Sequence, residues 1–214
     1  MCGRSFSGDS SSWPQDAANR VEAVWRTATW VRGNLERKLD AATLARHSGL
    51  SPRHFHRLFL QELGETPAAH IQRLRLELAA TWLAYTDFPA IEAALASGYE
   101  SREGFVRGFH AHFDATPNTF RARMRARRNC IAPKWPPTLG DPYELTLPPM
   151  TLAAWPHLGN TAKAITTWMA LGQWGRQRGL VNPHVLPVTV LYDDEGITPS
   201  RYSRLDAALV LENN

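Results

Sequence analysis

Apolar side chains recur every three or four positions through the first 128 residues, which is the spacing of helices with one buried face. From Val21 to Leu35 this spacing predicts a first helix over 18–38, and the polar, Ser/Gly-rich stretch 1–17 before it is expected to be flexible. Further helices are predicted over 41–48, 52–63, 67–85 and 90–97. After residue 128, prolines crowd 129–142, and the apolar pattern beyond them changes. The sequence therefore predicts a helical part and a mixed part joined by a linker.

The helical part contains a near-repeat of itself at an offset of 49–50 residues. The first copy has Ser51, Phe55, Arg57 and Phe59 where the second has Ser101, Phe105, Arg107 and Phe109. Each copy is predicted to be a short helix, a turn with glycine, and a second helix that buries phenylalanines. Two copies are too few for a stacked array, so the pattern indicates two helix-turn-helix units.

Each predicted turn carries residues that end one helix and begin the next. Gly49 is expected to adopt the left-handed backbone, Ser51 to cap the following helix, and Pro52 to occupy its first position. Ser101 is the corresponding cap in the second unit. The faces expected to stay exposed carry Arg53, His56, Arg57 and Leu60 in the first unit, and Glu103, Val106, Arg107 and His110 in the second.

Between the two units lies one long predicted helix, 67–85. At 1.5 Å per residue it spans about 28 Å, close to the roughly 34 Å of one turn of B-form DNA. A strut of that length lets two exposed helices enter successive major grooves on one side of a duplex.

Charge supports a nucleic-acid partner for the helical part. The whole chain carries a net charge of +4, but residues 18–128 contain 17 basic and 11 acidic residues, a net +6. Arginine supplies most of the basic residues, although an arginine-rich genome explains that ratio equally well. The asymmetry favours a DNA-binding part joined to a neutral part.

Several classes of protein are disfavoured by the sequence. No apolar run is long enough to span a membrane, and the amino terminus lacks an export signal, so a cytoplasmic protein is expected. Two cysteines exclude a disulfide scaffold. Nucleophile-elbow, P-loop and zinc-protease motifs are missing, and the histidine pairs are spaced two apart on helices, where side chains diverge. We therefore expect no enzyme, no cofactor and no metal site.

The last third of the chain predicts strands and one helix. Strands are expected over 143–157, 188–192 and 205–211, with a helix over 161–178. The predicted fold class is multidomain: an all-α tandem helix-turn-helix domain over 18–128, the linker 129–142, and a partial α+β region of βαββ order over 143–214.

Residues 21–125 resemble the AraC/XylS family of DNA-binding domains. The matching runs are Gly49–Phe59, Gly64–Pro67, Arg73–Glu77, Ser97–Ser101, Phe105–Phe109 and Thr116–Arg121. The resemblance implies a bacterial, sequence-specific transcriptional regulator that binds double-stranded DNA and contacts RNA polymerase. By position it implies a DNA-binding set of Ser51, Arg53, His56, Arg57, Ser101, Arg102, Glu103, Arg107 and His110. Asp114 stands where the family usually has glycine and His110 where it often has lysine, so the second unit is expected to contribute less affinity.

Residues 143–214 resemble the first βαββ repeat of a GyrI-like effector-binding domain. The resemblance rests on Met150–Trp155, the helix from Thr161, and the acidic loop Asp193–Pro199. It implies a small-molecule effector, with Trp155, Trp168 and Tyr192 either lining a cleft or forming core. Only one repeat precedes Asn214, so either the domain is truncated or a second chain supplies the other half as a dimer.

The sequence thus predicts a DNA-binding transcriptional regulator with two recognition helices, modulated by an effector at its C-terminal part. Two alternatives remain open. One is a ligand-binding or enzymatic GyrI-like protein whose DNA-binding part is secondary, and the other is an architectural DNA-binding protein without sequence preference.

Overall fold

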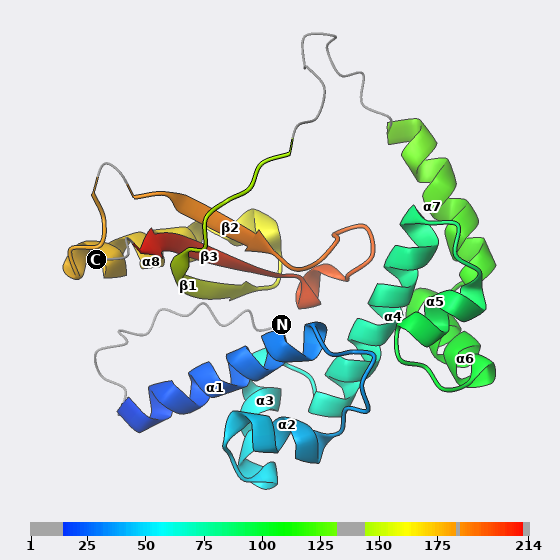
Figure 1. Ribbon diagram of the computed structural model, residues 1–214, viewed down its shortest axis with the longest axis horizontal. Helices are drawn as coiled ribbons and strands as arrows, with labels where there is room; N and C mark the ends of the chain where they lie inside the picture. Colours follow the sequence, from blue (N-terminus) through cyan, green and yellow to red (C-terminus); the bar gives the residue numbers. More distant parts are fainter. Residues whose placement is uncertain (1–14, 132–143, 183–184, 212–214) are drawn as a thin grey trace. The chain divides into compact units, whose positions relative to one another are not determined.

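The computed structural model describes residues 15–131, 144–182 and 185–211. They form two compact units, a helical unit before residue 132 and a small sheet unit after residue 143, and each is described by itself (Figure 1). Within these described ranges, no helix is both long and apolar enough to cross a bilayer.

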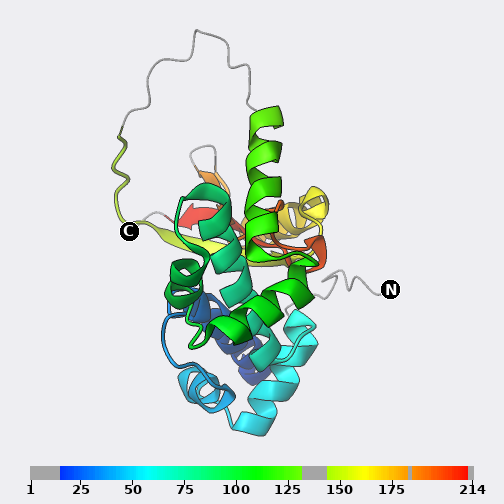
Figure 2. The same ribbon diagram turned by 90° about the vertical axis from the view of Figure 1, so that its right-hand side faces the viewer.

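The helical unit confirms the predicted pair of helix-turn-helix motifs. Its helices are α1 (Gln15–Arg32), α2 (Ala41–Ser48), α3 (Pro52–Leu63), α4 (Pro67–Tyr85), α5 (Ala90–Ala96), α6 (Arg102–Phe113) and α7 (Pro117–Ile131). The motifs are α2–α3 and α5–α6, and in the view of Figure 1 they lie on either side of α4. The last helix, α7, packs alongside α4 (Figures 1 and 2). The long helix α4 is therefore the element around which both motifs assemble.

Left-handed residues end the helices where the sequence predicts them. Gly49 ends α2 with φ 72°, and Gly64 ends α3 with φ 73°. Asp114 ends α6 with φ 48°, so it adopts the backbone that Gly64 has in the first motif. A side chain in this conformation costs about 1–2 kcal/mol, although aspartate tolerates it better than most residues.

Two phenylalanines anchor the second helix of each motif. Phe55 and Phe59 are completely buried, with ring centroids 5.3 Å apart. Phe105 and Phe109 repeat the arrangement in the second motif, again at 5.3 Å. Burial of large aromatic side chains is a main source of stability in a small core, so these pairs fix which face of α3 and α6 is exposed.

The segment that follows α1 joins the first motif to the turn of the second. The Arg75 side chain, on α4, donates from Nε to the carbonyl of Leu35 (3.1 Å) and from Nη2 to that of Arg37 (2.7 Å). Gly98, in the α5–α6 turn, has φ 82°, and a Cβ there would lie 2.3 Å from the Leu35 carbonyl oxygen. The α5–α6 turn and the segment after α1 therefore lie so close together that only glycine fits at position 98.

Three expected boundaries in the helical unit are wrong. The first helix ends at Arg32 and not at residue 38, because Gly33 follows and the carbonyls beyond it bind Arg75, although Leu35 is still buried. The helix begins at Gln15, so residues 15–17 are helical and not part of a flexible stretch as expected. The rest of that stretch, 1–14, lies outside the described residues. The helix α7 reaches Ile131, into the expected linker, and stops short of Pro133, whose ring disfavours helix before it.

The sheet unit has the predicted strand–helix–strand–strand order. Its elements are β1 (Thr151–Leu158), the turn η2 (Thr161–Lys163), α8 (Ile165–Gln177), β2 (Pro187–Leu191), the turn η3 (Ser200–Tyr202) and β3 (Arg204–Leu211). β3 lies between β1 and β2 and pairs antiparallel with both. The first strand begins at Thr151 and not at residue 143, because Pro148 and Pro149 have no N–H to donate to a neighbouring strand.

Candidate nucleic-acid interface

The helices α3 and α6 present matching exposed faces. From residue 51 to 60 and from 101 to 110, the alternation of buried, half-buried and exposed positions is identical. The exposed residues shared with the predicted site are Arg53, His56 and Arg57 on α3, and Arg102, Glu103, Arg107 and His110 on α6. The structure therefore brings the predicted DNA-binding residues onto two equivalent helix faces.

On α3, the arginine at the centre of the exposed face has a local partner. Nη2 of Arg57 lies 3.1 Å from Nδ1 of His54, one helical turn earlier. Because the guanidinium has five N–H donors, this contact leaves donors for a further acceptor. Arg53 and His56 are exposed beside it.

The two predicted serine caps behave differently. Ser101 accepts a hydrogen bond from the Gly104 N–H at 3.2 Å, as expected. Ser51 holds the cap position, but its hydroxyl makes no capping bond. Pro52 presets the first turn but does not exclude a cap, since Thr66 accepts from the Ala69 N–H at 3.2 Å with Pro67 at the same position.

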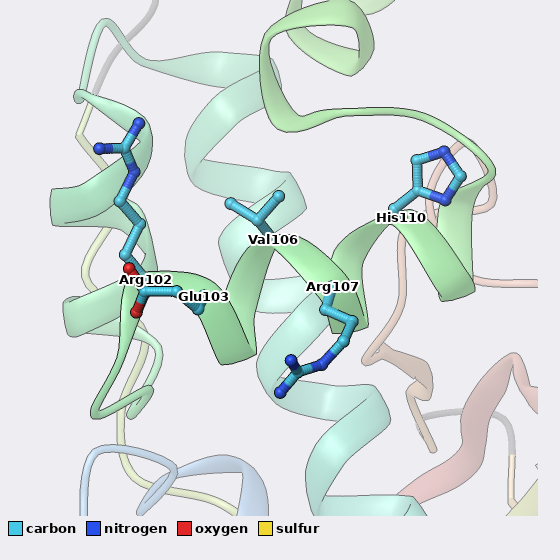
Figure 3. A pocket seen from close by; sticks show the side chains of 5 residues that line it. All are labelled: Arg102, Glu103, Val106, Arg107 and His110. Atoms are coloured by element: carbon cyan, nitrogen blue, oxygen red, sulfur yellow. The ribbon is translucent and has the colours of Figure 1, made fainter.

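On α6, five side chains line an open hollow of about 490 Å³: Arg102, Glu103, Val106, Arg107 and His110. Figure 3 shows that the guanidinium groups of Arg102 and Arg107 point away from each other along this face. The hollow combines two cations, one carboxylate and one methyl-bearing side chain. These groups can match guanine, cytosine and thymine edges, respectively.

A buried cluster of charged side chains lies behind these faces, at α4. Arg73 on α4 donates to Oε1 of Glu65 (2.7 Å) and to Oε2 of Glu77 (2.9 Å). His70 donates from Nδ1 to Oε1 of Glu65 at 2.7 Å. All four side chains are less than 8% exposed. Buried charges are tolerated only when paired in this way.

The cluster extends from one motif to the other. Glu65 lies in the turn after α3, and the His70 ring packs edge-on against Phe59 of α3 with centroids 5.2 Å apart. At the other end, Oε1 of Glu77 is 4.0 Å from Nε2 of His112, in the last turn of α6. The charged chain therefore touches both recognition-helix candidates.

Burial and hydrogen bonding shift the pKa values of this cluster. Burial alone would raise the pKa of Glu65, but hydrogen bonds from His70 and Arg73 outweigh it and hold that pKa below the usual value. Burial lowers the pKa of His70 and prevails over the opposing effect of Glu65. The pKa of His70 is therefore lower in the folded protein than in the unfolded chain.

We expect acid to destabilise the helical unit through His70. Because its pKa is lower in the folded state, unfolding takes up a proton once the pH falls below the unfolded value of about 6.5. In urea titrations, the free energy of unfolding should fall more between about pH 7.5 and about pH 5.5 in the wild type than in His70→Phe. His56→Phe, which changes an exposed histidine, should keep the wild-type slope. Equal slopes in wild type and His70→Phe would contradict this assignment.

This cluster was not predicted from the sequence. The sequence of α4 does contain an indication of it, because the spacing of His70, Arg73 and Glu77 places them on a helix face with buried aliphatic residues. A helix apolar on nearly all sides that still carries charges needs partners for them. Glu65 and His112 could not be assigned as those partners from spacing, because they lie on other elements.

The aromatic residues proposed for effector binding lie in or beside the core of the sheet unit. Trp155 and Trp168 are partly buried and pack against the cluster formed by Leu171, Ala207 and Leu209. Tyr192 donates its hydroxyl proton to Asp206 (2.7 Å), and the Arg204 guanidinium lies 4.4 Å from its ring centroid. These are contacts of partly buried residues, and a role for the three in effector binding stays a prediction.

Comparisons with known proteins agree with the helical unit. A model of a helix-turn-helix domain matches residues 44–123. The regulatory protein SoxS of Salmonella typhimurium is 33% identical over 95 residues, which cover 44% of this chain and 89% of SoxS. YbfP of Bacillus subtilis, an uncharacterised HTH-type transcriptional regulator, is 35% identical over 104 residues, 49% of this chain but only 35% of YbfP.

A solved structure is similar to half of the chain. The transcriptional regulator with an AraC-type DNA-binding domain from Chromobacterium violaceum is 30% identical, with a TM-score of 0.47, over 50% of this chain and 96% of that one. The matched region 44–123 begins within α2 and contains the rest of the first motif, the second motif and the helix between them. Because the chain is 33% identical to SoxS and covers 89% of its length, it belongs to the AraC family of helix-turn-helix transcriptional regulators.

Proposed function

We propose that the protein is a sequence-specific DNA-binding transcriptional regulator that inserts α3 and α6 into successive major grooves. The observation that carries this proposal is the repeated geometry of the two helices. Each is held by two buried phenylalanines and presents arginine on its opposite face. The 19 residues of α4 separate them by a distance suited to one turn of DNA.

Roles follow for the individual residues. Arg53, His56 and Arg57 would read bases from α3, and Arg102, Glu103 and Arg107 from α6. Arginine binds guanine through two parallel hydrogen bonds, and glutamate accepts from cytosine. Ser51 and Ser101, at the N-caps of the two helices, and His110, in the last turn of α6, would contact phosphates.

We infer a regulatory rather than an enzymatic role for the chain. The GyrI-like resemblance of residues 143–214 supports an effector site near Trp155, Trp168 and Tyr192, which are only partly buried. Contact with RNA polymerase and pairing of two copies through this unit rest on the resemblances and stay predictions.

Selection of binding sites from random duplexes, followed by a salt titration, tests the proposal. A selected duplex and its scrambled version should both show steep salt dependence, because phosphate neutralisation releases counterions from either. The selected sequence should nevertheless bind about 10³-fold more tightly. Equal affinity for both duplexes at every salt concentration would favour an architectural protein.

A further inference from the structure

The buried charged cluster connects the two recognition helices by a route other than the backbone of α4. Its members in order are Glu65, Arg73, Glu77 and His112, called the charged bridge below. We propose that the charged bridge is a positioning device that fixes α3 relative to α6 and so sets the base-pair spacing between the two sub-sites that the protein accepts. This inference rests on the proposed function.

The geometry of the bridge is directional. The planar guanidinium of Arg73 reaches Glu65 with Nε and Nη2 and Glu77 with Nη1, so it holds one carboxylate on each side. Such forked charge-assisted hydrogen bonds constrain angle as well as distance, which apolar contacts do not. A buried ion pair adds little net stability compared with well-packed apolar residues. The buried ion pairs are therefore better explained by the single arrangement of α3 and α6 that they specify than by added stability.

Both ends of the bridge act on a recognition helix. Glu65 binds His70, whose ring packs against Phe59 on the buried face of α3. Nε2 of His112 lies 4.0 Å from Oε1 of Glu77, an ion pair when the imidazole is protonated, and the ring packs edge-on against Phe113, with ring centroids 4.6 Å apart, at the end of α6. A rotation of either helix about α4 would break a contact at one end.

Small changes in this arrangement matter on DNA. One base pair more or less between two sub-sites moves the second by about 3.4 Å and turns it by about 35° around the helix axis. A pair of helices held at one angle rejects that change. A pair that can rotate accommodates it.

The test measures spacing preference in the full-length chain. The preferred duplex of the wild type is found by selection, and versions with one base pair inserted or removed between the sub-sites are then titrated. The wild type should lose about tenfold or more in affinity on either altered duplex, the size of one lost base contact. Glu77→Gln keeps the shape of the side chain but removes its charge. The affinity of this variant for the preferred duplex should be within about threefold of the wild-type affinity. Its affinity for each altered duplex should be within about threefold of its own affinity for the preferred duplex.

His112→Gln is the second variant, and it should show the same broadened preference. His112 is 20% exposed, so its replacement is compatible with folding even if Glu77→Gln is not. Val24→Ala is the matched control, because it removes buried aliphatic volume from α1, a helix that carries no member of the bridge. It should lower stability but keep the wild-type spacing preference.

The inference is overturned if folded Glu77→Gln and His112→Gln reject altered spacing as strongly as the wild type. It is also overturned if Val24→Ala broadens the preference equally, or if the wild type protects only one sub-site in a footprint. Failure of the proposed function is distinct, since the wild type would then select no preferred sequence.

Discussion

Replacing Gly98 with alanine should lower the free energy of unfolding of the helical unit by about 2–5 kcal/mol, the largest stability loss expected here for a single methyl group. Two effects add at this position. The φ of 82° costs any residue with a Cβ, and the new Cβ would lie 2.3 Å from the Leu35 carbonyl oxygen and 2.8 Å from Nε of Arg75. Those two groups are hydrogen-bonded to each other, so neither can move without loss.

The repeat supplies a matched control for this substitution. Gly49 occupies the equivalent turn of the first motif with φ 72°, but nothing lies within 4 Å of the Cβ it would gain. Gly49→Ala should therefore cost only the backbone term, about 1–2 kcal/mol. Thermal or urea unfolding of both variants measures the difference. Equal losses would mean that the close approach at Gly98 relaxes freely.

Arg57→Ala should weaken binding to the selected duplex by about 5- to 150-fold, which corresponds to the loss of one bidentate arginine–guanine contact. Arg107→Ala should cost less, because the second unit carries His110 where a lysine would hold a phosphate more strongly. Selectivity should relax at the base that each arginine reads. Fluorescence anisotropy titrations against the selected duplex and its single-base variants measure both effects.

Arg46→Ala is the control for charge. Arg46 is an exposed arginine of α2 that binds the Thr43 hydroxyl and is not part of the α3 face. Its loss removes the same positive charge and should change affinity for matched and mismatched duplexes alike. If Arg57→Ala behaved like Arg46→Ala, Arg57 would not read bases. An Arg107→Ala loss equal to or larger than that of Arg57→Ala would contradict the ranking of the two units.

The tandem motif could be predicted from sequence because its signals are local. Glycine at a helix end, proline at a helix start and phenylalanines four residues apart each act within a turn or two of chain. Asp114 shows the same logic, since a left-handed residue is required where α6 ends and aspartate can supply it.

What the sequence did not predict depends on contacts between distant elements. The end of α1 is set partly by Arg75, which lies 40 residues from Leu35 and takes carbonyls that a longer helix would use. The charged bridge joins residues of a turn, a helix and the end of another helix. The helical periodicity of the sequence could therefore indicate only its two members on α4, Arg73 and Glu77. The exposed faces were predicted correctly, but which bases they contact depends on DNA that the sequence does not describe.

The bonds from Arg75 to the Leu35 and Arg37 carbonyls have a consequence for how the helical unit opens. They attach the segment after α1 to α4, and the Leu35 carbonyl in that segment also lies against Gly98 in the α5–α6 turn, so α2–α3 cannot detach without disturbing contacts of α5–α6. Amide protons in the two motifs should therefore exchange with solvent deuterium together, as one cooperative foldon, despite the repeated architecture that would otherwise allow each half to melt independently.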